Sequence, residues 1–213
     1  MFNKPEYTRF LPHYQPKGSI FFVTFRLQGS LPRTFFDRLS DWYQTEKEGI
    51  LLEANAALRE QALYLLQRDY FRKLDASLDQ CLCGATHLAN PIIAGKITEQ
   101  LRRFDHQWYR LLAYTIMPNH VHVLLDFSIQ SDKTAYVSLS EVMNRIKGAS
   151  ARNAHLALGK TGAFWQPEYH DRYIRNQRHL LAAVDYIKQN VVTANICAHW
   201  REHPFTWIHE DFW

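Results

Sequence analysis

Two histidines separated by one apolar residue, His120 and His122, carry the clearest chemical signal in this chain. They lie in the β-prone run 117–125, MPNHVHVLL, and alternate residues of a strand point to the same face of a sheet. The two imidazoles would therefore project side by side, with Val121 and Val123 directed to the opposite face. Neighbouring imidazoles on a rigid strand suit a divalent metal ion, which indicates chemistry on a phosphate or a carbonyl group. Two half-buried histidines without a ligand are the alternative explanation.

A second candidate group lies in a predicted helix over 177–192. Tyr186 and Asn190 are four residues apart and therefore share one side of that helix, at the flank of the apolar stripe that docks on the sheet. An Asn amide oxygen is a suitable ligand for Mg²⁺ or Mn²⁺, and a Tyr hydroxyl can attack phosphorus. The alternative for Tyr186 is an amphipathic side chain with a packed ring and a solvated hydroxyl.

Basic residues without acidic neighbours indicate a phosphate-facing surface. No Asp or Glu occurs in residues 142–167, although the formal net charge of the whole chain is only +4. A segment of one sign is a candidate surface for nucleic acid, and a solvated helix face is the alternative. The basic residues of this segment are Arg145, Lys147, Arg152 and Lys160.

The composition is typical of a globular protein with one core. The chain has 213 residues, of which 46% are hydrophobic. No apolar run reaches the roughly 18 residues of a membrane helix, and the first residues lack the apolar segment of a secretory signal, so we expect a cytoplasmic protein without a membrane partner. The three cysteines, Cys81, Cys83 and Cys197, match neither a disulfide framework nor a structural zinc site.

The elements that would position these residues alternate between strands and helices. Strands are predicted over 19–27, 108–116, 120–127 and 164–174. Helices are predicted over 34–78 with a break at Gly49, and over 91–106, 139–158 and 177–192. This order predicts an α/β fold of the α+β type, a ferredoxin-like sandwich with a four-stranded antiparallel sheet and an expanded helical first crossover. We expect one domain over 1–192, with an irregular N-terminal arm (1–18), a helical insertion (34–78) and an irregular C-terminal tail (193–213) packed on it.

Together these segments resemble the HUH single-tyrosine transposase superfamily, and more closely the REP-associated tyrosine transposases with an IS200-like transposase domain. The matching segments follow in the family's order: LPHYQP (11–16), FVTFRL (22–27), MPNHVHVLL (117–125), FWQPEYHDRYIR (164–175) and DYIKQN (185–190). The two histidines alone are weakly specific, whereas the ordered set is highly specific. The chain departs from the family after Asn190, where Val-Val-Thr stands in place of Pro-Val-Lys. That departure removes one phosphate contact and leaves the expected chemistry untouched.

The resemblance implies an HUH-type endonuclease and strand transferase that acts on single-stranded or hairpin DNA of REP elements. His120 and His122 would bind Mg²⁺ or Mn²⁺, and Asn190 would complete the metal site. Tyr186 would be the nucleophile that forms a 5′-phosphotyrosine intermediate. The expected location is the nucleoid. The residues expected to hold the DNA backbone are Arg145, Lys147, Arg152, Lys160, Arg172, Arg175 and Arg178.

Two other interpretations fit the same residues. A catalytically silent, domesticated DNA-binding protein would keep the fold and lose turnover, and a metal-dependent phosphohydrolase would release a free 5′-phosphate instead of a protein adduct. One tyrosine per chain is compatible with a homodimer or with a monomer that acts sequentially, and with action in cis or in trans.

Overall fold

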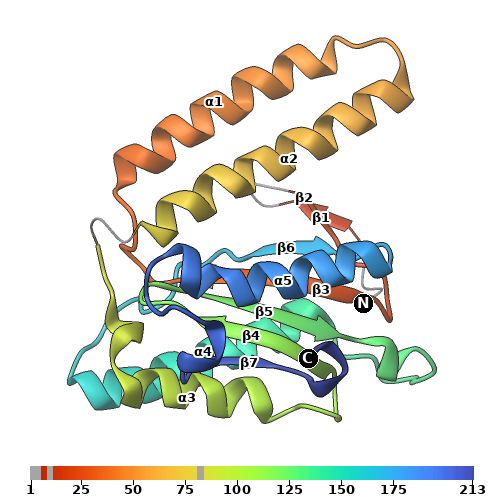
Figure 1. The fold of residues 1–213 in the computed structure, drawn as a ribbon. Helices are drawn as coiled ribbons and strands as arrows, with labels where there is room; N and C mark the ends of the chain where they lie inside the picture. Colours follow the sequence, from red (N-terminus) through yellow and green to blue (C-terminus); the bar gives the residue numbers. More distant parts are fainter. Residues whose placement is uncertain (1–5, 9–11, 81–83) are drawn as a thin grey trace.

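A five-stranded antiparallel sheet forms the centre of the computed structural model, which describes residues 6–8, 12–80 and 84–213 (Figure 1). The strand order is β6-β3-β5-β4-β7. The strands are β3 (Ile20–Arg26), β4 (Arg110–Ile116), β5 (His120–Asp126), β6 (His170–Tyr173) and β7 (Thr206–Ile208). The predicted α+β fold with an antiparallel sheet is confirmed, and four of the strands fall within predicted ones. The fifth, β7, comes from the tail that was expected to be irregular, and it pairs with the edge strand β4.

Helices cover both faces of the sheet, which explains why its inner strands are buried almost throughout. α3 (Pro91–Arg102) and α4 (Leu139–Leu158) pack on one face, against Val121 and Val123. α5 (Gln177–Thr193) packs on the other face, against Phe22 and Leu124 (Figure 1). Side chains of Asn90, Ser138 and Asn176 cap the starts of these helices, because such residues satisfy otherwise unpaired backbone N–H groups.

The helical insertion is a hairpin of two long helices that stands over α5 (Figure 1). α1 (Arg33–Leu51) continues through Gly49, where a break was predicted, and α2 (Ala56–Asp79) begins at the capping side chain of Asn55. The two helices share their own apolar cluster, separate from those on the sheet. That cluster consists of Leu31, Leu39, Tyr43, Leu66, Tyr70, Leu74 and Leu78. The hairpin is therefore stabilised largely by its own packing.

Close backbone contacts hold the two ends of the insertion together. Gly84 has φ +91°, and a Cβ at this position would lie 2.3 Å from the carbonyl oxygen of Gly29, so only glycine fits here. The backbone N–H of Ala85 donates to the same Gly29 carbonyl at 3.1 Å. The side chain of Asn119 donates to the Leu78 carbonyl at 3.0 Å, which fixes the last turn of α2 against the sheet.

The N-terminal arm carries a short hairpin where no regular structure was expected. β1 (Glu6–Thr8) pairs antiparallel with β2 (Pro12–Tyr14). The arm lies against β6, where the Gln15 side chain donates to Asp171 at 3.1 Å. The expectations for Cys81 and Cys83 lie outside the described residues. Within the described ranges, none of the helices has both the length and the apolar character of a membrane span.

Candidate active site

The two histidines project from β5 toward α2 and α5, side by side as their spacing predicts. Both side chains are fully buried, and their Nε2 atoms lie 3.0 Å apart. The other nitrogen of each ring has a partner: Asn119 Oδ1 lies 2.6 Å from His120 Nδ1, and Thr24 Oγ1 lies 2.7 Å from His122 Nδ1. Such contacts orient an imidazole and leave its Nε2 available to an ion.

The protonation state of the pair suits a metal site. Burial lowers the pKa of His120 to about 3. Burial, and then the neighbouring His120, lowers the pKa of His122 well below its usual value. Both imidazoles are therefore neutral near pH 7, which is the form that binds a metal ion.

Two carboxylates of α2 face the histidines from the insertion. Asp75 Oδ1 lies 3.4 Å from His122 Nε2, and Asp79 Oδ1 lies 3.5 Å from His120 Nε2. Asp75 is only 2% exposed, and neither of its oxygens has a hydrogen-bond partner among the described residues. Desolvation and then the neighbouring Asp79 raise the pKa of Asp75 well above its usual value. Desolvation also raises the pKa of Asp79 to about 6, although a hydrogen bond from Asn190 opposes the shift.

The orphaned carboxylate and the two facing imidazole Nε2 atoms together fit a divalent cation. Asp75, His120 and His122 each offer one ligand atom, and these atoms lie within 4.8 Å of one another. Adjacent ligands of an octahedral ion with bonds of about 2.1 Å lie about 3 Å apart, which matches the Nε2–Nε2 distance of 3.0 Å. A mixed nitrogen and oxygen donor set suits Mn²⁺ better than Mg²⁺, because Mg²⁺ prefers oxygen ligands.

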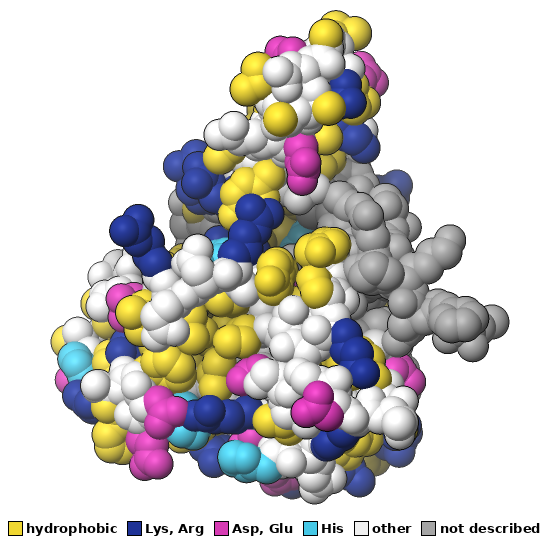
Figure 2. Space-filling view, turned by 90° about the vertical axis from the view of Figure 1, so that its right-hand side faces the viewer, with side chains coloured by type: hydrophobic (Ala, Val, Ile, Leu, Met, Phe, Trp, Pro, Cys, Tyr) yellow, Lys and Arg dark blue, Asp and Glu magenta, His cyan; other side chains and the backbone are white. Residues whose placement is uncertain are grey.

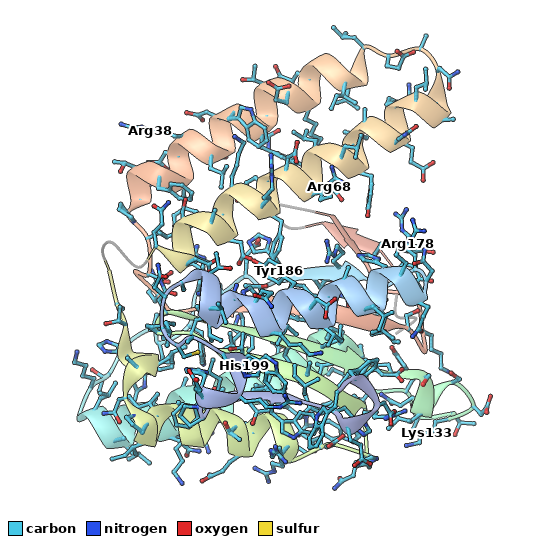
Figure 3. All side chains as sticks on the ribbon, in the orientation of Figure 1. Arg38, Arg68, Lys133, Arg178, Tyr186 and His199 are labelled. Atoms are coloured by element: carbon cyan, nitrogen blue, oxygen red, sulfur yellow. The ribbon has the colours of Figure 1, made fainter. Side chains whose placement is uncertain are left out.

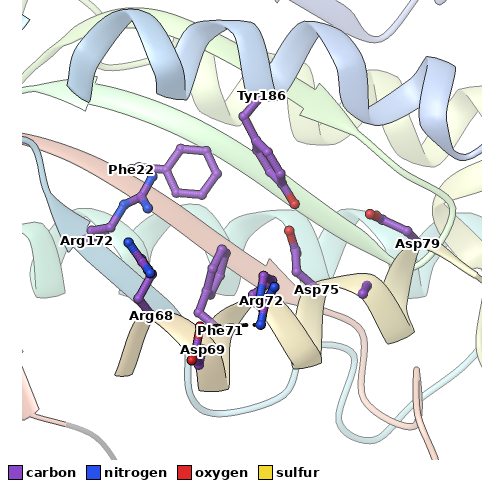
Figure 4. Close-up of a pocket in the computed structure, with 10 residues that line it drawn as sticks. Phe22, Arg68, Asp69, Phe71, Arg72, Asp75, Asp79, Arg172 and Tyr186 are labelled. Atoms are coloured by element: carbon purple, nitrogen blue, oxygen red, sulfur yellow. Dashed lines mark ion pairs between the residues drawn. The ribbon is translucent and has the colours of Figure 1, made fainter. Parts of the chain in front are cut away.

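Tyr186 and Asn190 lie on the side of α5 that faces this group. The Tyr186 ring contacts His122, with centroids 5.4 Å apart, and Phe22, with centroids 5.8 Å apart. Tyr186 is 36% exposed, and Figure 4 shows its hydroxyl directed toward the Asp75 carboxylate. Asn190 is buried, and its Oδ1 has no hydrogen-bond partner in the described part of the chain. The predicted nucleophile therefore lies beside the predicted metal ligands.

A pocket of about 580 Å³ lies beside the buried histidines and is lined by Tyr186, Asp75 and Asp79 among others. It opens between α2 on one side and α5 and β6 on the other (Figure 4). Asp75 and Asp79 line one end, Arg68 and Arg172 line the other, and Tyr186 lies along the wall between them (Figure 4). The pocket thus has an acidic end and a basic end with a hydroxyl group between them.

The predicted DNA-contacting residues are divided between the two faces of the sheet. Arg172 lines the pocket, and the guanidinium of Arg175 lies 4.2 Å from the Tyr64 ring of α2. Arg178 lies in the first turn of α5, on the same face (Figure 3). Of these three residues, Arg172 lines the pocket together with Tyr186.

The other four predicted contacts lie on or after α4, on the opposite face of the sheet. The Lys147 ammonium donates to the backbone carbonyls of Gln166 and Pro167 at 2.8 and 2.7 Å, so it anchors the chain that leads to β6. Arg145 and Arg152 line a separate pocket of about 290 Å³. The fold does not bring Arg145, Lys147, Arg152 and Lys160 together with the histidines.

The acidic residues of α2 were not predicted as site residues. One signal was available: Asp75 interrupts the buried stripe of α2, next to Leu74 and before Leu78. Acidic residues are rarely buried without a partner or a metal ion. Asp75 and Asp79 also share one helix side because they are four residues apart.

Comparisons with known proteins show what this chain is similar to. Residues 88–190 match the family model described as "Transposase IS200 like". A curated relative from Haemophilus influenzae, "Putative REP-associated tyrosine transposase", is 22% identical over 111 residues. The match includes 50% of this chain and 63% of the relative, so the chain spans less than two thirds of that protein.

A solved structure has the same fold. It is titled a REP-associated tyrosine transposase bound to a REP hairpin, and it superposes with a TM-score of 0.50 at 18% identity. The superposition covers 94% of this chain and 81% of the other. The matched family segment contains His120, His122, Tyr186 and Asn190 but begins after the insertion that carries Asp75. Residues 88–190 are thus similar to an IS200-like transposase domain, and the chain resembles the REP-associated tyrosine transposases.

Proposed function

We propose that the protein cleaves and rejoins single-stranded DNA at hairpin repeats, with Tyr186 as the nucleophile and a divalent ion as cofactor. The observation that carries this proposal is the position of Tyr186, whose ring lies 5.4 Å from that of His122 and whose hydroxyl points to the orphaned Asp75 carboxylate (Figure 4). Tyr186 and the candidate ligand Asp75 line the same pocket, and the buried His122 lies in contact with the Tyr186 ring. The solved relative bound to a REP hairpin supports hairpin DNA as the substrate class.

The residues that would hold the ion are His120, His122 and Asp75, with Asn190 beside them. When bound, a divalent cation withdraws charge from the phosphate oxygens and orients the phosphorus for attack. Thr24 and Asn119 hold the imidazole rings in place for this role. The cation would also reduce the free-energy cost of burying the Asp75 carboxylate, because it would neutralise the charge.

Tyr186 would supply the covalent step. Its Oη forms a bond to phosphorus, and the bond from phosphorus to the 3′ oxygen breaks. The phenol loses one proton, and the departing 3′ oxygen takes up one proton. A phenol ordinarily titrates near pH 10, so a proton acceptor near the hydroxyl would assist the attack. Asp79, whose pKa is raised to about 6, has the basicity of a general base near neutral pH. The phosphotyrosine retains the phosphodiester energy, so a 3′ hydroxyl of another strand can reverse the step.

A denaturing gel tests this function directly. Purified protein is mixed with a single-stranded hairpin oligonucleotide from the repeats that flank the gene, labelled at its 3′ end, in Mg²⁺ or Mn²⁺. We expect a labelled band at the mass of the protein plus the 3′ fragment. The band should disappear in EDTA and in Tyr186→Phe, and persist in Tyr173→Phe, which removes a hydroxyl from the neighbouring strand β6.

The outcomes separate the three candidate functions. Labelled fragments without an adduct, undiminished in Tyr186→Phe, would indicate a phosphohydrolase. Binding of several flanking hairpins without adduct or cleavage in either metal would identify a DNA-binding protein that has lost the chemistry.

A further inference from the structure

We infer that Arg68 of the insertion and Arg172 of β6 form a second phosphate-binding subsite, which holds the unpaired strand one step away from Tyr186. The identification of the anion as a DNA phosphodiester rests on the proposed function. The matched family segment begins at residue 88, so Arg68 belongs to a part of the chain that the family model does not include. The helical hairpin would thus supply half of a substrate contact.

The first observation is a pair of like charges that face one another. Figure 4 shows the guanidinium groups of Arg68 and Arg172 directed toward the same space. Burial lowers the pKa of Arg172; Tyr64 and Asp75 oppose this shift, and the charge of Arg68 adds a smaller lowering. Nε of Arg172 is buried and has no hydrogen-bond partner among the described residues. Two guanidinium groups with an unused donor between them are suited to an anion such as phosphate.

Neighbouring carboxylates do not satisfy this pair. Asp69, which also lines the pocket, is paired with Arg72 at 3.5 Å (Figure 4). Asp75 attracts Arg172, but it lies at the histidine end of the pocket, 3.4 Å from His122. The pocket is therefore polarised, with room for a cation at one end and for an anion at the other. A nucleic acid strand with a metal ion on one phosphate and arginines on the next would satisfy both ends.

The basic end continues onto the surface beside the pocket. Arg175 lies over the Tyr64 ring at 4.2 Å, and the N-terminus of α5 starts at Gln177, where the helix dipole also favours negative charge. Figure 2 shows Lys and Arg side chains gathered where the helical protrusion meets the body of the molecule. A backbone that leaves the pocket here would remain in a positive field.

The shape of the pocket favours an unpaired strand. Its volume of about 580 Å³ is that of a small-ligand site, and it has room for a nucleotide or two but not for a duplex. Phe22 and Phe71 line it, and aromatic rings of this kind accept unstacked bases. Passage between α2 and α5 would therefore select single-stranded DNA next to the hairpin.

Equilibrium binding without chemistry tests the subsite. A labelled single-stranded oligonucleotide is titrated with Tyr186→Phe protein in EDTA, and fluorescence anisotropy gives the Kd between 50 and 200 mM salt. We expect Arg68→Gln in this background to raise the Kd about tenfold. The slope of log K against log salt should become shallower by about 0.7, which is the value for one lost phosphate contact on a single strand. Arg68→Lys should restore the slope but only part of the affinity, because it keeps the charge and loses the bidentate geometry.

Arg38 provides a matched control. It lies on α1 of the same hairpin, away from the pocket (Figure 3), so Arg38→Gln should change neither the Kd nor the slope. An Arg68→Gln variant with unchanged Kd and slope would overturn the subsite. Strand binding that depends on Arg68, without any adduct from the Tyr186 protein, would keep the subsite and reject the proposed chemistry. Adduct formation that is indifferent to Arg68, together with unchanged binding, would keep the chemistry and reject the subsite.

Discussion

Replacing Asp75 with Asn should make the metal-free protein more stable. The carboxylate is 2% exposed and has no hydrogen-bond partner within the described chain, and its raised pKa in the folded state means that ionisation opposes folding above the unfolded pKa of 3.8. A buried unsatisfied polar group costs about 1–3 kcal/mol, and more when it is charged. Asn keeps the shape without the ionisation, so we expect a gain of about 1–3 kcal/mol at pH 7.5. That gain corresponds to a rise in Tm of about 3–10 °C for a chain of this size, and it should vanish near pH 4.

The substitution Asp75→Asn should also reduce the stabilisation of the protein by a bound metal ion. An ion present at 100 times its Kd stabilises the protein that binds it by about 2.7 kcal/mol. Loss of the Asp75 ligand should reduce the affinity at least as much as loss of an outer-shell partner, which is about 10- to 100-fold. At the same metal concentration the variant would then gain only about 0.4–1.4 kcal/mol. The two effects have opposite signs, which a general loss of folding cannot produce.

Thermal unfolding in EDTA and in Mn²⁺ measures both effects. Asp69→Asn is the control, because Asp69 lies on the same helix in a partly exposed pair with Arg72, and its loss should change stability by less than about 0.5 kcal/mol. A variant Asp75→Asn that melts below the parent protein in EDTA and keeps the full Mn²⁺ shift would refute the assignment of Asp75 as a metal ligand.

Three further outcomes follow from the same geometry. The pKa of Asp79 is about 6 in the folded state against 3.8 when unfolded. The free energy of unfolding of the metal-free protein should therefore fall by at most about 3 kcal/mol as the pH rises from 4 to 7. Urea unfolding should show a smaller fall in Asp79→Asn, and an equal fall in that variant would contradict the role of Asp79. Thr24→Val removes the partner of His122 Nδ1 and should weaken Mn²⁺ binding about 10- to 100-fold by calorimetry, whereas unchanged affinity would exclude an orienting role. Leu74 is 0% exposed in the core of the insertion, and Leu74→Ala should lower the free energy of unfolding by about 2–5 kcal/mol; a loss below 1 kcal/mol would show that the hairpin core contributes little.

Short-range geometry could be predicted from the sequence. The two-residue period of a strand places His120 and His122 on one face whatever the rest of the chain does, and the helical period places Tyr186 and Asn190 on one side of α5. The turn at 117–119 joins β4 to β5 as predicted. These relations are local, so they could be obtained without knowledge of the fold.

The contacts between elements distant in the chain depend on the folded arrangement and could not be predicted from local patterns. A helical pattern shows that Asp75 and Asp79 share a side, but not that this side faces β5, because that depends on the close approach at Gly84 and on the bond from Asn119 to α2. The basic segment of α4 was correctly predicted as a helix. The face of the sheet on which this helix packs depends on the crossover connections, and these cannot be predicted from the periodicity of the sequence. The positive end of the pocket is formed instead by Arg68 and Arg172, residues from an insertion and an edge strand that lie far apart in the chain and meet only because α2 folds back over the sheet.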